Sequence, residues 1–329
     1  MKVIEKLVSE YDLGTLLDSP VKVTGGLTHT TYKFLTNKDT FIVKLLNPNI
    51  MKRETALPNF NKADELEKRL KVENINILPA LTFGDKSLLN IDGQYLYVFK
   101  YYNGKSLLSE EIREDHCKIV ARELAKIHNI EKRDEVYLRD EINIDWNYYL
   151  ELAKEKNKKI YDLLVDKIDV LNKSMINGNR SLANIPCVVT ICHNDMDSKN
   201  ILWNEMDFKI IDLECLGYSN PYIEFFQLAL CWSGYERCNI NFSLLKTFID
   251  EYFNNVLVDE IDWSVIYFAN FGRLEWLEFN LKRSFLIDCD SVEEQEIGFK
   301  EVEETLEHVV YYDSIKDELL KYFEKKNIN

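Results

Sequence analysis

The spacing of apolar residues changes near residue 106, and this change limits the folds that the chain can adopt. Before that point, apolar residues come in short runs separated by Asn, Asp and Gly, a pattern typical of β-strands. After it, apolar residues recur about every 3.6 residues, as they do along one face of a helix. Strands followed by helices favour an α+β fold with two lobes.

The pattern predicts four strands and one helix in the first part: strands at 21–23, 32–35, 40–46 and 95–101, and a helix at about 59–72. It predicts six helices in the second part, at 112–130, 146–175, 221–232, 242–256, 263–286 and 292–323. Two apolar strands that end in acidic residues, CVVTICHND and FKIIDLE, interrupt these helices within 187–214. The turn-like stretch YYNGKS predicts the lobe boundary, with domains at 1–99 and 106–329 and a hinge at 100–105.

Charge and cysteine content exclude several classes of protein. Residues 1–99 carry a net charge of +1 and residues 100–329 a net charge of −16. Nucleic acids and anionic membranes demand a concentrated basic patch, so neither is an expected partner. No stretch has the roughly 18 uncharged apolar residues of a membrane span, and the seven cysteines form no CxxC pair. We expect a cytoplasmic monomer or homodimer without structural zinc.

The polar stretch HNDMDSKN follows the first of the two late strands. It contains Asp195 and, five residues later, Asn200; the second strand delivers Asp212. Phosphoryl transfer needs a carboxylate that accepts a hydroxyl proton, and oxygen ligands that hold Mg²⁺ on the phosphates. The spacing matches that of the kinase catalytic loop. Asp195 is therefore the predicted base, and Asn200 and Asp212 are the predicted metal ligands.

These motifs resemble those of a known family. HNDMDSKN with IIDLE is similar to the signatures of the aminoglycoside phosphotransferase and choline kinase superfamily, which comprises protein-kinase-like small-molecule kinases. Further resembling segments occur in the family's order: VTGGLTHTTYKF, FIVKLL, YVFKYYNGKSL, LAKIH and NPYIEFFQLA. The resemblance covers nearly the whole chain. It implies a two-lobe fold with a small β-rich N-terminal lobe and a larger, mostly helical C-terminal lobe.

The resemblance also implies a nucleotide site with Mg²⁺ and ATP, or GTP, as cofactors. Lys44 would reach the α- and β-phosphates, and a helix carboxylate would hold it there. Glu65 is the predicted partner of Lys44, with Glu54 and Glu67 as alternatives. The hairpin GGLTHTTY lacks GxGxxG, so backbone amides and the Thr28 hydroxyl would cradle the phosphates. The predicted adenine contacts at the hinge are Phe99, Lys100 and Tyr102.

Each residue has an ordinary structural explanation when it is taken alone. His193 is explained equally well as a core histidine, Lys44 as an edge-strand lysine, and Asp212 as a turn residue. Glu224 stands where the family has Asp, and would cap its helix or brace the catalytic loop. The joint occurrence of these residues in the family's order favours the kinase interpretation.

The charge of the last third of the chain indicates which kind of molecule would accept the phosphate. Residues 275–307 hold 11 acidic residues and three basic ones, and aromatic residues alternate with acids in the preceding helix. In the family, the corresponding helices face the acceptor pocket, so carboxylates and aromatic faces there would favour a cation. The alternative is a solvated acidic face over an aromatic core. The candidate acceptor residues are Asp197, Glu214, Trp232, Tyr235, Glu275, Trp276 and Glu278.

The sequence thus predicts a kinase that moves the γ-phosphate of ATP or GTP to a hydroxyl of a small cationic molecule, as an aminoglycoside phosphotransferase does. One alternative is a metabolite kinase of the choline, ethanolamine or thiamine type. The other is a catalytically silent kinase-like binding protein. Retention of Asp195, Asn200, Asp212 and Lys44 together argues against silence, because a pure binder needs no base.

Overall fold

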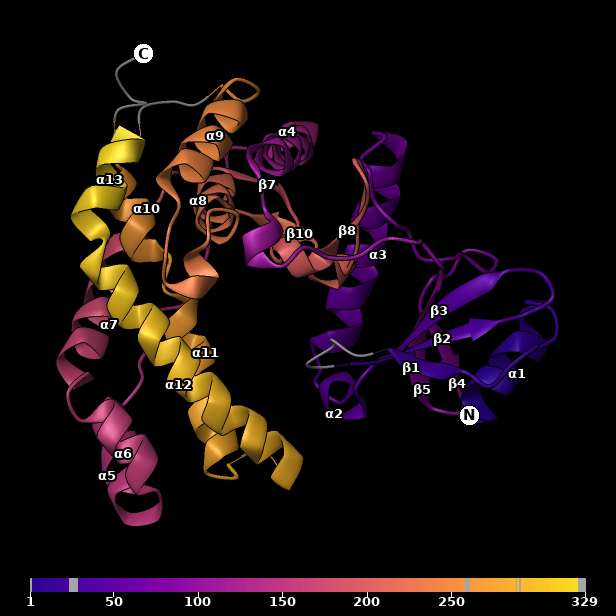
Figure 1. The fold of residues 1–329 in the computed structure, drawn as a ribbon, viewed down its shortest axis with the longest axis horizontal. Coiled ribbons are helices and arrows are strands. Elements are labelled where there is room, and N and C mark those ends of the chain that lie inside the picture. Colours follow the sequence, from indigo (N-terminus) through magenta and orange to yellow (C-terminus); the bar gives the residue numbers. More distant parts are fainter. Residues whose placement is uncertain (1, 24–28, 258–260, 288, 290, 325–329) are drawn as a thin grey trace. The chain divides into compact units, whose positions relative to one another are not determined.

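The computed structural model describes residues 2–23, 29–257, 261–287, 289 and 291–324 (Figure 1). The chain divides into two compact units. The first unit comprises Met1–Leu108 and Ile191–Tyr218, and the second comprises Ser109–Thr190 and Ser219–Asn329. The segment that carries HNDMDSKN therefore belongs to the same unit as the N-terminal strands. The predicted bounds of the lobes and hinge stay a prediction.

The first unit contains an antiparallel five-stranded sheet in the order β1-β2-β3-β5-β4. The strands are β1 (Val21–Val23), β2 (Thr30–Leu35), β3 (Thr40–Leu45), β4 (Leu89–Ile91) and β5 (Gln94–Lys100). All four predicted strands are present, and β4 is an additional one. In the central strand β3, Lys44 lies opposite Tyr97 of β5 and Thr31 of β2. Directly opposed residues share a face, so Lys44 and Tyr97 point to the same side of the sheet.

The two faces of this sheet pack against different helices. One face contributes Val43 and Leu96 to a core with Ile4 and Leu7 of α1 (Lys2–Glu10), a helix that the sequence analysis did not predict. The face that carries Tyr97 packs on Phe60 of α3 (Ala56–Val72), which confirms the helix predicted at 59–72. The short helix α2 (Pro48–Met51) precedes α3. Lys44 therefore points to the side of the sheet that α3 covers.

The later segment of the first unit supplies two strand ends and a hairpin. The strand β7 (Val189–Cys192) runs across the boundary between the units and is followed by the 3₁₀ turn η2 (Ser198–Asn200). The strands β8 (Ile201–Asn204) and β9 (Asp207–Ile210) then pair antiparallel, and η3 (Leu213–Cys215) and β10 (Gly217–Ser219) follow. Strands at β7 and β9 were predicted, whereas β8 was not.

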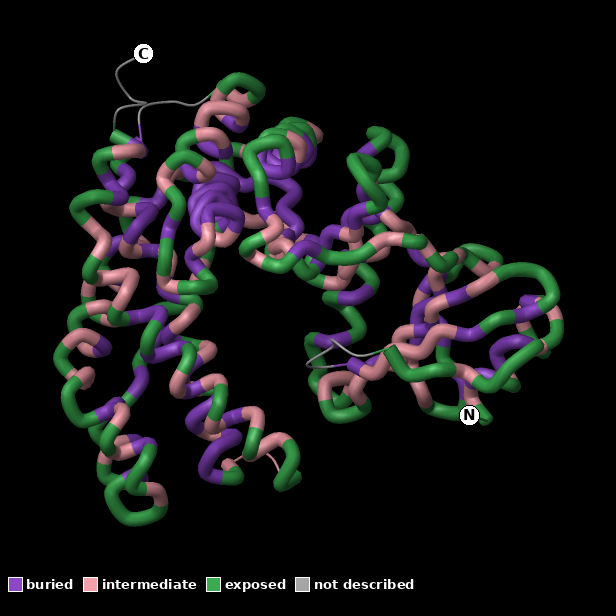
Figure 2. Tube along the Cα trace, in the orientation of Figure 1, coloured by how far each residue is buried: buried purple, intermediate pink, exposed green. Residues whose placement is uncertain are grey.

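The second unit is mostly helical. Its elements are η1 (Ser109–Glu111), α4 (Glu114–Ile130), β6 (Lys132–Arg133), α5 (Trp146–Lys156), α6 (Lys158–Leu164), α7 (Ile168–Leu182), α8 (Pro221–Cys231), η4 (Tyr235–Arg237), α9 (Phe242–Phe253), α10 (Trp263–Ala269), α11 (Gly272–Ser284), α12 (Val292–Ser314) and α13 (Lys316–Glu324). The helix α8 is buried along most of its length (Figure 2). Among the described residues, no helix combines the length and apolar character of a membrane span.

Three long predicted helices are broken in the structure, and these predictions were wrong. The stretch 146–175 forms α5, α6 and the start of α7, because the Asn157 side chain accepts the Ile160 N–H and starts a new helix. The stretch 263–286 is interrupted at Asn270, whose backbone is not helical. The stretch 292–323 is divided at Ile315. Each broken helix keeps its apolar face, which is why the periodicity continued across the breaks.

Glu67 of α3 generates a prediction about stability. Burial raises the pKa of this carboxyl from 4.5 to about 7, although the Ala80 N–H donates to it at 2.9 Å. The folded state therefore holds a proton that the unfolded state has lost, and stability falls as pH rises from about 4.5 to 7. We expect Glu67→Gln to become more stable than wild type by up to about 3 kcal/mol above pH 7, measured by chemical denaturation. An equal difference at pH 5 and pH 8 would contradict this.

Candidate active site

The loop after β7 is fixed by a histidine. The His193 side chain is fully buried, and its Nδ1 accepts a hydrogen bond from the Asp195 N–H at 3.3 Å. Because Nδ1 accepts, the ring proton lies on Nε2, which donates to the Ile211 carbonyl at 3.1 Å. His193 thereby joins the loop that carries Asp195 to the strand end that carries Asp212. Its contacts are structural, as one of the sequence interpretations held.

Asn200, the predicted metal ligand, binds Asp195, the predicted base. Asp197 starts the turn η2, since its carboxylate accepts the Lys199 N–H at 3.1 Å. The turn presents Asn200, whose amide donates to both the carbonyl and the carboxylate of Asp195, each at 2.8 Å. The backbone carbonyl of Asn200 in turn accepts the Ile211 N–H at 2.9 Å. The Asp195 carboxylate is thus oriented by backbone and side chain of the same loop.

Asp212 and Lys44 meet beside this loop. Asp212 has the left-handed backbone conformation, with φ of 63°, directly after β9. The Lys44 ammonium lies 2.6 Å from Asp212 Oδ1 and 2.6 Å from Glu214 Oε2. Lys44 is thus bound to Asp212, Asn200 is bound to Asp195, and the Ile211 N–H, next to Asp212, links the two pairs through the Asn200 backbone carbonyl.

Burial and neighbouring charges alter the acidity of these groups. Burial raises the pKa of the Asp195 carboxyl, with Lys199 acting against the rise. The Lys199 ammonium lies 2.8 Å from Asp197 Oδ2 and 3.4 Å from Asp195 Oδ1. Burial alone would lower the pKa of Lys44, but the charges of Asp212 and Glu214 raise it. A raised carboxyl pKa brings Asp195 closer to neutral pH, where a general base works best.

Asn200 and Asp212 suit a magnesium ion by their chemistry. Mg²⁺ prefers oxygen ligands, often one or two carboxylates completed by phosphates and water. The Asn200 amide hydrogens bind Asp195, so the carbonyl oxygen is the atom that this side chain offers to a cation. Oδ1 of Asp212 binds Lys44, and Oδ2 is the oxygen that this carboxylate would offer to the cation. The donor set fits the predicted metal.

The predicted partner of Lys44 is wrong. Glu65 and Glu54 are both exposed, and Glu67 accepts the Ala80 N–H. Lys44 pairs with Asp212 and Glu214 instead. Glu214 was predicted as an acceptor residue; its two carboxylate oxygens bind His29 and Lys44, and its contact with an acceptor stays a prediction. The predicted phosphate ligand Thr28 lies outside the described residues.

The predicted hinge residues continue from the end of β5. Phe99 is half-buried and Lys100 is exposed, with its ammonium 3.1 Å from Asp39 Oδ2. The Tyr102 hydroxyl donates to Asp207 Oδ2 at 2.9 Å. Desolvation and this carboxylate raise the pKa of Tyr102 to about 12. Adenine contacts at these residues stay a prediction.

The predicted acceptor residues of the second unit already have partners there. Glu275 pairs with Arg139, and Glu278 accepts from Tyr149 at 3.0 Å and pairs with Lys282 at 3.3 Å. These pairs favour the alternative of a solvated acidic face. The Trp276 indole N–H donates to Glu301. Tyr235 is buried, and its hydroxyl donates to the His308 carbonyl. Trp232 is buried at the C-terminal end of α8. Burial argues against Trp232 and Tyr235 as direct acceptor contacts.

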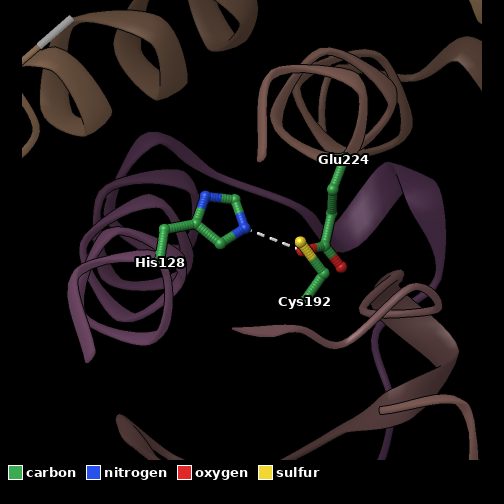
Figure 3. A group of neighbouring side chains, drawn as sticks. All are labelled: His128, Cys192 and Glu224. Atoms are coloured by element: carbon green, nitrogen blue, oxygen red, sulfur yellow. Dashed lines mark hydrogen bonds and ion pairs between the residues drawn. The ribbon is translucent and has the colours of Figure 1, made fainter. Parts of the chain in front are cut away.

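A buried polar chain in the second unit contains Glu224, whose contact with His128 is drawn in Figure 3. Its Oε2 lies 2.7 Å from Nε2 of His128, whose Nδ1 lies 2.7 Å from the Tyr252 hydroxyl. The N-terminus of α8 is capped by Asn220, which accepts the Tyr222 and Ile223 N–H groups. Glu224 therefore braces α8 against the helix that carries His128.

The sequence of this chain is similar to those of several ethanolamine kinases. The human protein "Ethanolamine kinase 2" is 25% identical to this chain over 221 residues, which are 66% of this chain and 50% of that relative. The chain spans half the length or less of the curated relatives that it matches.

Solved structures of similar fold include two kinases. A spectinomycin phosphotransferase, in complex with ADP and spectinomycin, has a TM-score of 0.69 at 11% identity and covers 94% of this chain and 98% of its own. An ethanolamine kinase of Plasmodium vivax has a TM-score of 0.52 at 17% identity, covering 87% and 81%. Such low identities show the fold alone, and they confirm the predicted kinase-like α+β fold.

Most of the chain matches the model of one protein family. Residues 21–254 match the model of a family described as "Phosphotransferase enzyme family". The match includes β1 to β10, and with them Lys44, Asp195, Asn200 and Asp212. The match covers most of the chain, and the chain therefore belongs to the phosphotransferase enzyme family.

Proposed function

We propose that this protein transfers the γ-phosphate of Mg²⁺-bound ATP, with GTP as the alternative donor, to a hydroxyl of a small amine-bearing molecule. The observation that carries the proposal is the network of the first unit. It contains the Lys44–Asp212 ion pair and the Asn200–Asp195 hydrogen bonds, and the Ile211 N–H joins them at the Asn200 backbone carbonyl, through contacts of 2.6 to 2.9 Å. These are the residue types that phosphoryl transfer requires.

The residues of the network have separate roles in this proposal. Asp195 accepts the proton of the attacking hydroxyl, and the two hydrogen bonds from Asn200 keep its carboxylate in one orientation. Lys44 provides a positive charge to the phosphates of the nucleotide. Asn200 and Asp212 would hold Mg²⁺, which neutralises charge on the β- and γ-phosphates when it is bound.

The acceptor class rests on chemistry that the relatives share. The relatives named above act, by their names, on ethanolamine and spectinomycin, and both compounds carry amine and hydroxyl groups. The pairing of Glu275 with Arg139 and of Glu278 with Lys282 does not support these residues as the amine site. We therefore propose an amine-bearing alcohol as the acceptor and assign no residue to its amine.

A phosphorylation screen with Asp195→Asn tests this function. We expect the purified wild type to phosphorylate one or more of ethanolamine, choline and spectinomycin in preference to neutral glycerol and glucose. Removal of the base should lower kcat by about 10²- to 10⁴-fold, while Mg-ATP affinity in calorimetry persists.

Two results would count against the screen's expectation. A wild type that binds Mg-ATP but phosphorylates none of these compounds would support the catalytically silent binding protein. Near-normal turnover by Asp195→Asn would show that Asp195 is not the base.

Metal binding gives a second expected outcome. Asp212→Ala should weaken Mg-ATP binding by about tenfold or more and raise the Mg²⁺ concentration needed for half-maximal binding, because a direct carboxylate ligand is lost. Calorimetric titrations with ATP at fixed Mg²⁺, and with Mg²⁺ at fixed ATP, measure both. Glu205→Gln, an exposed acidic residue of the same segment, is the matched control and should bind as wild type does. Normal binding by Asp212→Ala would mean that the metal site is misplaced.

A further inference from the structure

His29 connects three segments of the first unit and has no role in the function proposed above. Its side chain is buried, and its Nδ1 accepts a hydrogen bond from the Asn47 N–H at 2.9 Å. Its Nε2 lies 3.0 Å from Glu214 Oε1. Asn47 follows β3 and caps α2, and Glu214 lies in the turn after Asp212. His29 therefore links the start of β2, the end of β3 and the turn η3.

The hydrogen bonds define which form of the imidazole is present. The Asn47 backbone N–H can only donate, so Nδ1 of His29 carries no proton. The ring proton lies on Nε2, and Nε2–H donates to the Glu214 carboxylate. A neutral histidine thus holds Glu214 by a charge-assisted hydrogen bond, which is stronger than a neutral one.

Glu214 binds Lys44 as well as His29. Oε1 of Glu214 accepts from His29 and Oε2 binds the Lys44 ammonium at 2.6 Å, so the orientation of the carboxylate is set from two sides. Burial alone would raise the pKa of Glu214, but the hydrogen bond from His29 and the charge of Lys44 lower it. Glu214 is therefore a charged group whose position depends on His29.

The carboxylates of α3 have other partners. Asp64 accepts from the Tyr97 hydroxyl at 2.9 Å, Glu67 accepts the Ala80 N–H, and Glu65 is exposed. Within the part of the chain that the structure describes, none of these three forms an ion pair with Lys44. The helix that covers the Lys44 face of the sheet thus does not hold the lysine.

We propose that Glu214, held by His29, is the carboxylate that positions Lys44 for the nucleotide phosphates. The proposal rests on the proposed function, in which Lys44 contacts those phosphates. His29 and Glu214 are positioning residues, because they act through Lys44. Asp212 and Glu214 are two residues apart, so one short turn sets both a metal ligand and the lysine.

The first experiment compares acidic residues of the first unit by their effect on Mg-ATP affinity. Glu214→Gln should weaken binding by about tenfold, since a charge-assisted contact to Lys44 is lost. Glu65→Gln should have a smaller effect than Glu214→Gln, and Glu73→Gln at the exposed end of α3 should bind as wild type does. A larger loss in Glu65→Gln than in Glu214→Gln would overturn the proposal.

A pair of His29 variants separates positioning from general packing. Gln places an amide N–H near the position of Nε2, and Asn places an acceptor near Nδ1. Only Gln can still donate to Glu214. We expect His29→Gln to retain affinity within about threefold, and His29→Asn to lose about tenfold, with the KM of the acceptor unchanged in both. Equal losses of Mg-ATP affinity in the two variants would overturn the proposal, because they would show that His29 acts only by filling space.

Combined variants complete the test. In a Glu214→Ala background the difference between His29→Gln and His29→Asn should disappear, since both act through Glu214. A difference that persists in that background overturns the proposal. If a Glu214 variant does not fold, as judged by circular dichroism, the His29 pair decides alone. A wild type that binds Mg-ATP but phosphorylates nothing contradicts the proposed function only, whereas one that binds no nucleotide overturns both.

Discussion

The candidate active site depends on the neutralisation of one partly buried lysine. Burial disfavours the charged form of Lys44, yet the two carboxylates at 2.6 Å keep it protonated. A buried charge without such partners would cost several kcal/mol. The ion pairs therefore fasten β3 to the turn 212–214. Through the bond between the Ile211 N–H and the Asn200 carbonyl, the same turn is fastened to the loop that presents the base.

Much of this site could be predicted, because its chemistry lies in short local patterns. The spacing of Asp195 and Asn200, and the strand that ends before Asp212, are visible in the sequence. The strand that carries Lys44 was equally clear from its apolar neighbours. Two further features had a readable signal that was missed. Ile4, Leu7 and Val8 have the spacing of an amphipathic helix, and Glu278 stands four residues before Lys282, where an ion pair on one helix is expected.

Other features could not be predicted, because they depend on contacts between distant segments. The partner of Lys44 lies 170 residues away at Glu214, so no local pattern identifies it. A nearby helix carboxylate was the natural choice, but Glu65 is on the exposed face of α3; the buried face runs through Phe60, Ala63, Glu67 and Leu70. Likewise, β8 is a strand because β9 pairs with it. A lone histidine in a polar hairpin gave no sign that His29 would be buried between three segments.

The first unit is built from two stretches of chain, and this has a consequence for synthesis on the ribosome. The sheet and Lys44 are made first, and Asp212 follows 168 residues later. At about 5–20 residues per second, that interval lasts roughly 8–35 s. During this time the lysine has neither Asp212 nor Glu214, so no ion pair from the second stretch offsets the cost of burying its charge. The two carboxylates that compensate the charge of Lys44 therefore become available only once the second stretch has been translated.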